Sequence, residues 1–136
     1  ARRMAEGKAP VEETIGRAAT GFIAPAWLYG PGARAALAES GFALAEDHMS
    51  VWQPASGRVV ARGPVITWAS RSGPRTASSL LAAALGRTLL APLPTVRVAV
   101  HPGDIAKQSI VNSIDATLAA FTRRRTVGRY ADLLAA

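Results

Sequence analysis

The sequence predicts an α/β protein with parallel strands. Short apolar segments of strand character alternate with Ala-rich helical segments along the 136 residues, and this alternation is typical of parallel sheets. Glycine and proline, present 12 and 9 times, mark most of the expected boundaries. Hydrophobic residues make up 49% of the chain, which is enough for a substantial core in one domain or in part of a larger one.

The chain opens on an expected helix and a brief strand. Residues 1–15 are rich in Ala, Glu, Lys and Arg, with Pro10 as an irregularity that can begin a new helical segment. Gly16 supplies the stop. The strand follows over residues 20–25, and Pro25 ends it.

A second helix, a strand and a hairpin come next. The helix is expected over 33–40, after a Gly-Pro-Gly loop and before Gly41, and the strand over 42–45. Two further apolar segments flank the turn Pro54-Ala55-Ser56-Gly57. Together they predict a small β-hairpin insertion at about residues 50–62.

The second half repeats the alternation. A strand over 65–68 precedes a helix over 76–90 that is apolar nearly all round, and we expect that helix to be well buried or packed against another element. A strand over 95–100 then leads into a long helix from about 105 to 124, and 130–134 closes the chain as a short helix. The expected buried face of the long helix consists of Ile110, Ile114, Leu118 and Phe121.

Composition excludes several classes of protein. The absence of cysteine rules out a disulfide framework, a thiolate metal site and a cysteine nucleophile. No run of eighteen apolar residues is present, so stable membrane insertion is not expected. The charged N-terminus shows no signal peptide, which favours the cytoplasm without fixing the compartment.

The net charge of +7 comes almost wholly from arginine. Such a balance is compatible with nucleic acid, acidic glycans or anionic lipid surfaces. The one cluster, Arg123-Arg124-Arg125, falls at the expected end of a helix, where cations complement the helix dipole. Because no nucleic-acid-binding motif is present, we do not expect a nucleic-acid partner.

His101 is the first candidate for chemistry. It ends the expected strand 95–100 and is followed by a Pro-Gly turn, and ligands gather at the C-terminal ends of strands. Histidine is the usual general acid or base near neutral pH. A purely structural role, in which the ring donates to a nearby carbonyl at the strand end, is the alternative.

Three segments carry a family resemblance. They are Gly21-Phe22-Ile23-Ala24-Pro25-Ala26-Trp27-Leu28, Val98-Ala99-Val100-His101-Pro102-Gly103-Asp104 and Arg129-Tyr130-Ala131-Asp132-Leu133-Leu134. In these segments the chain resembles the C-terminal half of the polysaccharide deacetylase (NodB-homology) superfamily, with the nearer match to its DUF2334-like bacterial branch.

The resemblance implies a fold, an activity and a cofactor. It implies that residues 1–136 are the C-terminal portion of a deformed (β/α) barrel of the glycoside hydrolase and deacetylase type. The expected activity is metal-dependent hydrolysis of N-acetyl groups from a carbohydrate. The divalent metal, zinc in many members, is held by motifs of the N-terminal half, so the resemblance implies no metal ligand in this chain and no activity for the chain alone.

The resemblance also assigns roles to residues. Ala24, Pro25 and Trp27 match the active-site segment of the family, although Ile23 stands where the usual arginine would orient an acidic base. His101 matches the general acid that protonates the leaving amine. Ala99 replaces a customary leucine and would enlarge the acetyl pocket.

Further substrate-binding candidates complete the expected site. Asp104 can accept from the His101 ring or cap the next helix, and His48 follows a strand and can line the cleft. Trp68, with Trp27 and Trp52, is expected to offer faces on which sugar rings stack, while core packing is expected of at least one of the three. His48 and His101 lack a neighbouring carboxylate motif and so predict no metal site.

Two rival functions remain open at this point. One is a non-catalytic binding module for an anionic glycan or a protein partner, and the weaker one is a basic nucleic-acid-binding domain. The deacetylase hypothesis adds a partner of its own, the missing N-terminal half or another chain, because exposed strand edges of an incomplete barrel invite pairing.

Overall fold

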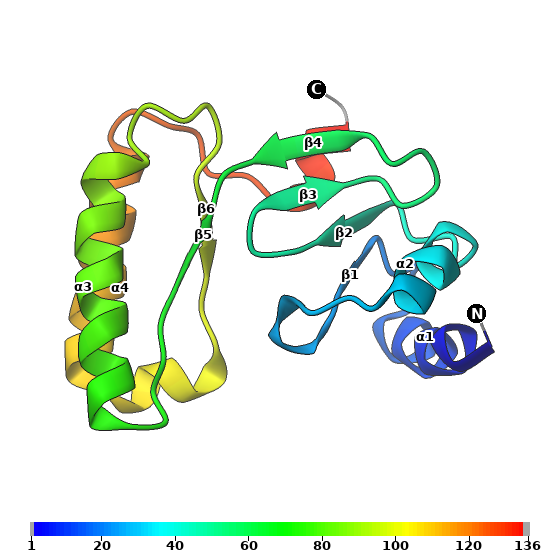
Figure 1. Cartoon of the computed structure of the whole chain (residues 1–136), viewed down its shortest axis with the longest axis horizontal. Coiled ribbons are helices and arrows are strands. Elements are labelled where there is room, and N and C mark those ends of the chain that lie inside the picture. Colours follow the sequence, from blue (N-terminus) through cyan, green and yellow to red (C-terminus); the bar gives the residue numbers. More distant parts are fainter. Residues whose placement is uncertain (1, 135–136) are drawn as a thin grey trace. The chain divides into compact units, whose positions relative to one another are not determined.

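The computed structural model describes residues 2–134 and is a mixed α/β structure, as predicted (Figure 1). The helices are α1 (Arg2–Ile15), α2 (Pro31–Ala38), α3 (Gly73–Leu89) and α4 (Gln108–Thr122), with short 3-10 helices η1 (Pro25–Trp27), η2 (Pro102–Ala106) and η3 (Tyr130–Leu134). The strands are β1 (Gly21–Ile23), β2 (Leu44–Glu46), β3 (Ser50–Trp52), β4 (Val59–Arg62), β5 (Val65–Thr67) and β6 (Arg97–Ala99). The chain divides into two compact units, of which unit 1 is Ala1–Arg62 with Gly128–Ala136 and unit 2 is Gly63–Val127.

Unit 1 is built on a sheet with the strand order β1-β2-β3-β4. Strands β1 and β2 are parallel, whereas β2, β3 and β4 pair antiparallel, so the predicted hairpin is confirmed. One face of the sheet packs a core around Leu37, Phe42, Ala45 and Trp52. The other face packs Leu44, Val51 and Ala61 against η3.

Unit 2 is built on the parallel pair β5 and β6. Helices α3 and α4 lie side by side (Figure 1) and enclose a core that includes Ile66, Trp68 and Ile110. The guanidinium of Arg97 is buried and donates to the carbonyl of Gly63 at 2.6 Å, which ties β6 to the start of β5.

Helix α4 begins later than predicted. The sequence predicts a helix from about 105, but η2 ends at Ala106 and Lys107 is extended, with φ −123° and ψ 114°, so α4 starts at Gln108. Its buried face also differs, because Thr117 is fully buried where Leu118, 44% exposed, was expected. The spacing 110, 114, 117, 121 follows the helical repeat more closely than 110, 114, 118, 121.

The helix over 76–90 was expected to be well buried or packed against another element, and the second expectation is confirmed, because α3 packs against β5 and α4. Leu81, Leu85 and Leu89 are each more than half exposed, because α3 has only one face against the sheet and α4. Separately, none of the helices within residues 2–134 has the length and apolar character that crossing a membrane requires.

Candidate functional site

The residues singled out in the sequence follow the carboxyl ends of the parallel strands. Ala24, Pro25 and Trp27 follow β1, His48 follows β2, Trp68 follows β5, and His101 and Asp104 follow β6. The first two groups belong to unit 1 and the last two to unit 2. The candidate residues therefore lie in both units.

The loop after β1 in unit 1 has a strained backbone. Ala26 and Trp27 have φ values of 52° and 56°, in the left-handed region that L-residues other than glycine rarely adopt. The left-handed conformation costs on the order of 1–2 kcal/mol for each such residue. Contacts with the surrounding residues must therefore stabilise the loop in this conformation. Pro25 begins η1, and the Trp27 N–H closes the turn onto the carbonyl of Ala24 at 2.9 Å.

The strained loop brings the indole of Trp27 to a buried acid. Trp27 Nε1 donates to Glu46 Oε1 at 2.7 Å, and Glu46 is only 2% exposed. Glu46 is the last residue of β2 and pairs in register with Ile23, the last residue of β1. Because β1 and β2 are parallel, the Trp27 loop and the Glu46 carboxylate come to the same edge of the sheet.

Tyr29 fastens this loop to β2. Its hydroxyl donates to the carbonyl of Glu46 at 2.6 Å and accepts the N–H of Ala24 at 3.1 Å. Burial raises the pKa of the Tyr29 phenol, and this outweighs the lowering by its backbone hydrogen bonds at Ala24 and Glu46. The phenol is therefore uncharged near pH 7, and its role is to hold the loop against β2.

His48 adds a second ring to the same edge. Its ring centroid lies 4.8 Å from that of Trp27, with the planes at 43°, and His48 is exposed. The intervening Asp47 is occupied structurally, because it accepts the N–H groups of Met49 and Ser50 at 2.9 and 2.8 Å. Burial raises the pKa of Asp47, but these hydrogen bonds and the Arg34 guanidinium outweigh it and leave the pKa below its usual value.

The edge of unit 1 thus combines an aromatic surface with hydrogen-bonding groups. Trp27 and His48 supply the rings, Glu46 supplies a fixed carboxylate, and Ile23 and Leu28 are exposed beside them at 52% and 74%. Aromatic faces match the apolar faces of pyranose rings, and a carboxylate accepts from hydroxyl or amine groups. The arrangement suits binding of a small polar molecule with apolar faces.

In unit 2, His101 is the N-cap residue directly before η2, and it is bound to Asp104. Asp104 is buried, and its Oδ2 accepts the backbone N–H of His101 at 2.8 Å while lying 3.6 Å from Nδ1 of the same residue. The buried carboxylate thus fixes the backbone at His101 and also faces its ring. The His101 side chain is 54% exposed, so its ring is reached from solvent and can give or take a proton.

Trp68 and Trp52 lie in the cores of their units. Trp68 is 5% exposed, and its indole N–H donates to Ser113 Oγ at 3.0 Å; Trp52 is 8% exposed. Buried indoles of this kind have no face available for a sugar, so the expectation of a sugar-stacking role at Trp68 is replaced by core packing. Of the three tryptophans, Trp27 is the one placed to meet a ligand.

The resemblance implies that the divalent metal is held by motifs of the N-terminal half, outside this chain. Within residues 2–134 no three histidine, aspartate or glutamate side chains gather as a metal-binding group. The carboxylates nearest the candidate residues already bind within the protein, Glu46 to Trp27 and Asp104 to His101. No metal-dependent step is therefore assigned to this chain's own side chains.

Glu46 and Tyr29 are the site residues that sequence reasoning missed. The signal for Glu46 was an acid placed directly at the end of an apolar strand, beside the His48 that was noticed. Tyr29 carried a weaker signal, as an aromatic residue two positions after Trp27. Their roles depend on the pairing of β1 with β2, which the local sequence does not specify.

Comparison with protein-family models, curated proteins and solved structures found no match to this chain.

Proposed function

We propose that the chain is the C-terminal part of a metal-dependent carbohydrate deacetylase domain, and that its strands belong to a deformed (β/α) barrel. The observation that carries the proposal is the position of Trp27: a strained loop at the carboxyl end of β1 fixes its indole on the buried Glu46, beside the ring of His48. Strain at such an edge is a mark of functional sites.

In this proposal the residues of unit 1 bind the sugar. The rings of Trp27 and His48 stack on a pyranose ring, and Glu46 orients the Trp27 indole through its N–H. Tyr29 holds the loop in place and takes no part in the chemistry. Ala24 and Pro25 form the backbone of the segment, with Ala24 buried against the sheet.

His101 of unit 2 is the proposed general acid. Hydrolysis of an N-acetyl group breaks the bond between the carbonyl carbon and nitrogen, and the departing amine needs a proton. His101 presents an exposed imidazole at the carboxyl end of β6, with the buried Asp104 carboxylate 3.6 Å from Nδ1.

The test is acetate release from an N-acetylated chito-oligosaccharide by the protein expressed from the full reading frame that encodes this chain. We expect zinc-dependent hydrolysis in which His101→Ala lowers kcat by about 100-fold or more and leaves KM nearly unchanged. Trp27→Ala is expected to raise KM. Undiminished hydrolysis in His101→Ala would contradict the assignment of the acid.

A non-catalytic module for an anionic glycan is the second candidate, and one observation favours it. The Arg34 side chain is 59% exposed in unit 1, where it lies over the Trp52 ring at 5.0 Å and 3.2 Å from Asp47. A guanidinium held in this way can bind a carboxylate or sulfate group of a sugar. Salt-sensitive oligosaccharide binding without any acetate release would favour this function over the deacetylase.

A further inference from the structure

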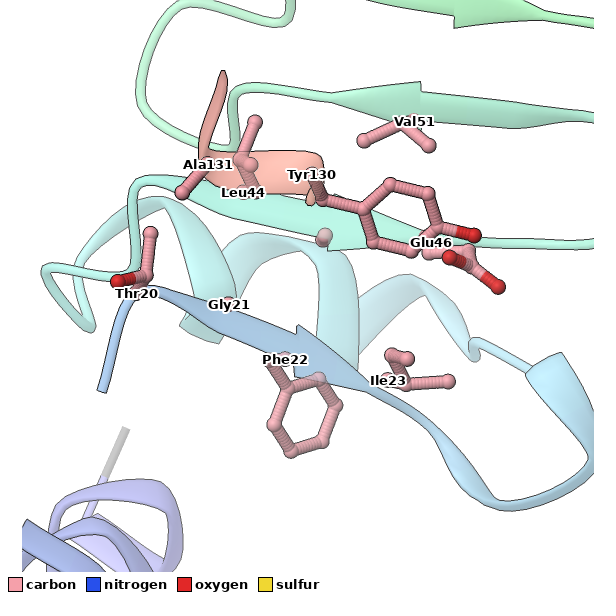
Figure 2. Close-up of a pocket in the computed structure, with 10 residues that line it drawn as sticks. Thr20, Gly21, Phe22, Ile23, Leu44, Glu46, Val51, Tyr130 and Ala131 are labelled. Carbon is pink, nitrogen blue, oxygen red and sulfur yellow. The ribbon is translucent and has the colours of Figure 1, made fainter. Parts of the chain in front are cut away.

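Unit 1 contains a cavity of about 180 Å³ between its sheet and η3. Figure 2 shows the lining: β1 and β2 present one face of the sheet, and Tyr130 and Ala131 of η3 lie against it. A dry apolar cavity of about 150 Å³ is known to hold a benzene molecule. The cavity in unit 1 therefore has room for a six-membered ring with one small substituent.

The walls of this cavity are largely apolar. Leu44 and Val51, 3% and 0% exposed, form part of the sheet face, and Ile23 continues it at the end of β1. Gly21 leaves additional space, because it pairs in register with Leu44 on the same face. Such walls favour a ligand with a compact hydrocarbon body.

Glu46 is the one charged residue among those lining the cavity. Tyr130 lines the same cavity, and Figure 2 shows its ring on the η3 side of the cavity. A carboxylate among apolar walls attracts a cation more strongly than it would in water, and an aromatic ring in the same cavity adds a cation–π contribution. Together these groups favour a positively charged donor at this end of the ligand.

We propose that this cavity binds a compact organic ammonium ion, a primary amine carried on a small apolar ring or branched chain. The ammonium group meets Glu46 and the face of Tyr130, and the hydrocarbon body fills the space between Leu44, Val51 and Gly21. The inference uses unit 1 alone and holds whether or not the chain serves a deacetylase.

The test compares two probes of nearly equal shape, cyclohexylammonium and cyclohexanol, by titration into the isotopically labelled full chain observed by NMR. We expect cyclohexylammonium to bind about tenfold or more tightly, a difference of about 1.4 kcal/mol, and to shift signals of residues 20–23, 44–46 and 130–131. Glucosamine, whose body is polar, is expected to bind more weakly than cyclohexylammonium. Equal binding of cyclohexanol, tighter binding of glucosamine, or no binding of any probe would overturn the proposal.

Two variants locate the site. Glu46→Gln keeps the size of the side chain and is expected to remove the preference for the ammonium probe. Gly21→Ala adds a methyl group 3.5 Å from the carbonyl oxygen of Leu44, which is an ordinary contact distance, so the protein is expected to fold. The methyl group narrows the cavity and is expected to weaken the binding of both probes. Asp132→Asn, which removes an exposed carboxylate of the same unit, is the control and is expected to leave both affinities unchanged. If Glu46→Gln fails to fold, the probe comparison in the unaltered chain and Gly21→Ala decide the question.

Discussion

The two units use a buried carboxylate in different ways. Unit 1 buries Glu46 at the end of β2, where it accepts the indole N–H of Trp27 from a strained loop, whereas unit 2 buries Asp104, which accepts the backbone N–H of the exposed His101. A buried acid with an oriented indole is suited to holding a ligand, because its geometry is fixed before the ligand arrives. An exposed imidazole is suited to exchanging a proton. In the function proposed above, sugar binding is therefore assigned to unit 1 and proton transfer to unit 2.

The largest expected effect on stability comes from a substitution in the apolar core of unit 2. Ile110 is fully buried between α4 and the sheet, so Ile110→Ala is expected to lower the free energy of unfolding by about 2–5 kcal/mol. The control is Leu118→Ala on the same helix, at a position 44% exposed, which is expected to cost much less. Denaturant unfolding measures both, and equal costs would show that the buried face of α4 has been misassigned.

A second comparison uses one backbone motif that occurs in both units. Asp104 accepts the N–H of His101 three residues earlier at 2.8 Å and is 1% exposed, and Asp132 accepts the N–H of Arg129 at 2.7 Å but is half exposed. Loss of such a cap costs about 1–2 kcal/mol where water cannot replace it. We expect that loss of stability for Asp104→Ala and a much smaller one for Asp132→Ala. Thermal and denaturant unfolding provide the measurement, and the reverse order would contradict the burial argument.

The strained loop of unit 1 gives the third prediction. Ala26→Gly removes the side chain from a residue at φ 52°, so the variant is expected to be more stable by about 1 kcal/mol. The matched control is Ala35→Gly in the interior of α2, which is expected to lose about 0.5–1 kcal/mol. A loss of stability in Ala26→Gly would show that the left-handed conformation is not adopted.

The smallest expected effect is the pH dependence carried by Asp47. Its pKa in the folded protein lies below the unfolded value near 3.8, so the folded state binds the proton more weakly. The stability contribution is therefore present above about pH 4 and is lost as the pH falls through the lower folded pKa. Asp47→Asn is expected to flatten the unfolding free energy between about pH 5 and pH 2 relative to the unaltered chain. An unchanged slope would show that Asp47 makes no net charge-dependent contribution.

Much of the secondary structure was predictable because its signals are local. Gly16 directly follows α1 with a φ value of 65°, and the hairpin turns where Pro54 and Gly57 indicated, whereas α2 ends at Ala38, three residues before the expected stop at Gly41. The end of η2 was not predictable in this way, because Lys107 is extended between two helical segments that have one continuous helical pattern. The spacing of apolar residues also predicted, wrongly, that Leu118 is buried. Whether Thr117 or Leu118 is buried depends on how α4 faces its neighbours.

The candidate site was predictable only in part. His48 and His101 were found because each follows a segment of strand character, and Trp27 was found through the family resemblance of residues 21–28. Glu46 and Tyr29 were missed, because their roles arise from the parallel pairing of β1 with β2 and from hydrogen bonds across that pair. Trp68 was included in the candidate site because the sequence does not distinguish a tryptophan that packs in the core from one that lines a binding site.

The central claim is that Trp27, held by its hydrogen bond to Glu46, forms the sugar-binding surface of this chain. The indole N–H signals of the three tryptophans in the chain test this claim directly. We would titrate the labelled chain with diacetylchitobiose and follow the indole N–H signals by NMR, assigning each with Trp27→Phe, Trp52→Phe and Trp68→Phe. The account predicts that the Trp27 signal shifts and saturates while those of the buried Trp52 and Trp68 stay in place, and that Trp27→Phe weakens binding. A Trp27 signal that does not move at high sugar concentration, or a shift centred on Trp68, would contradict it.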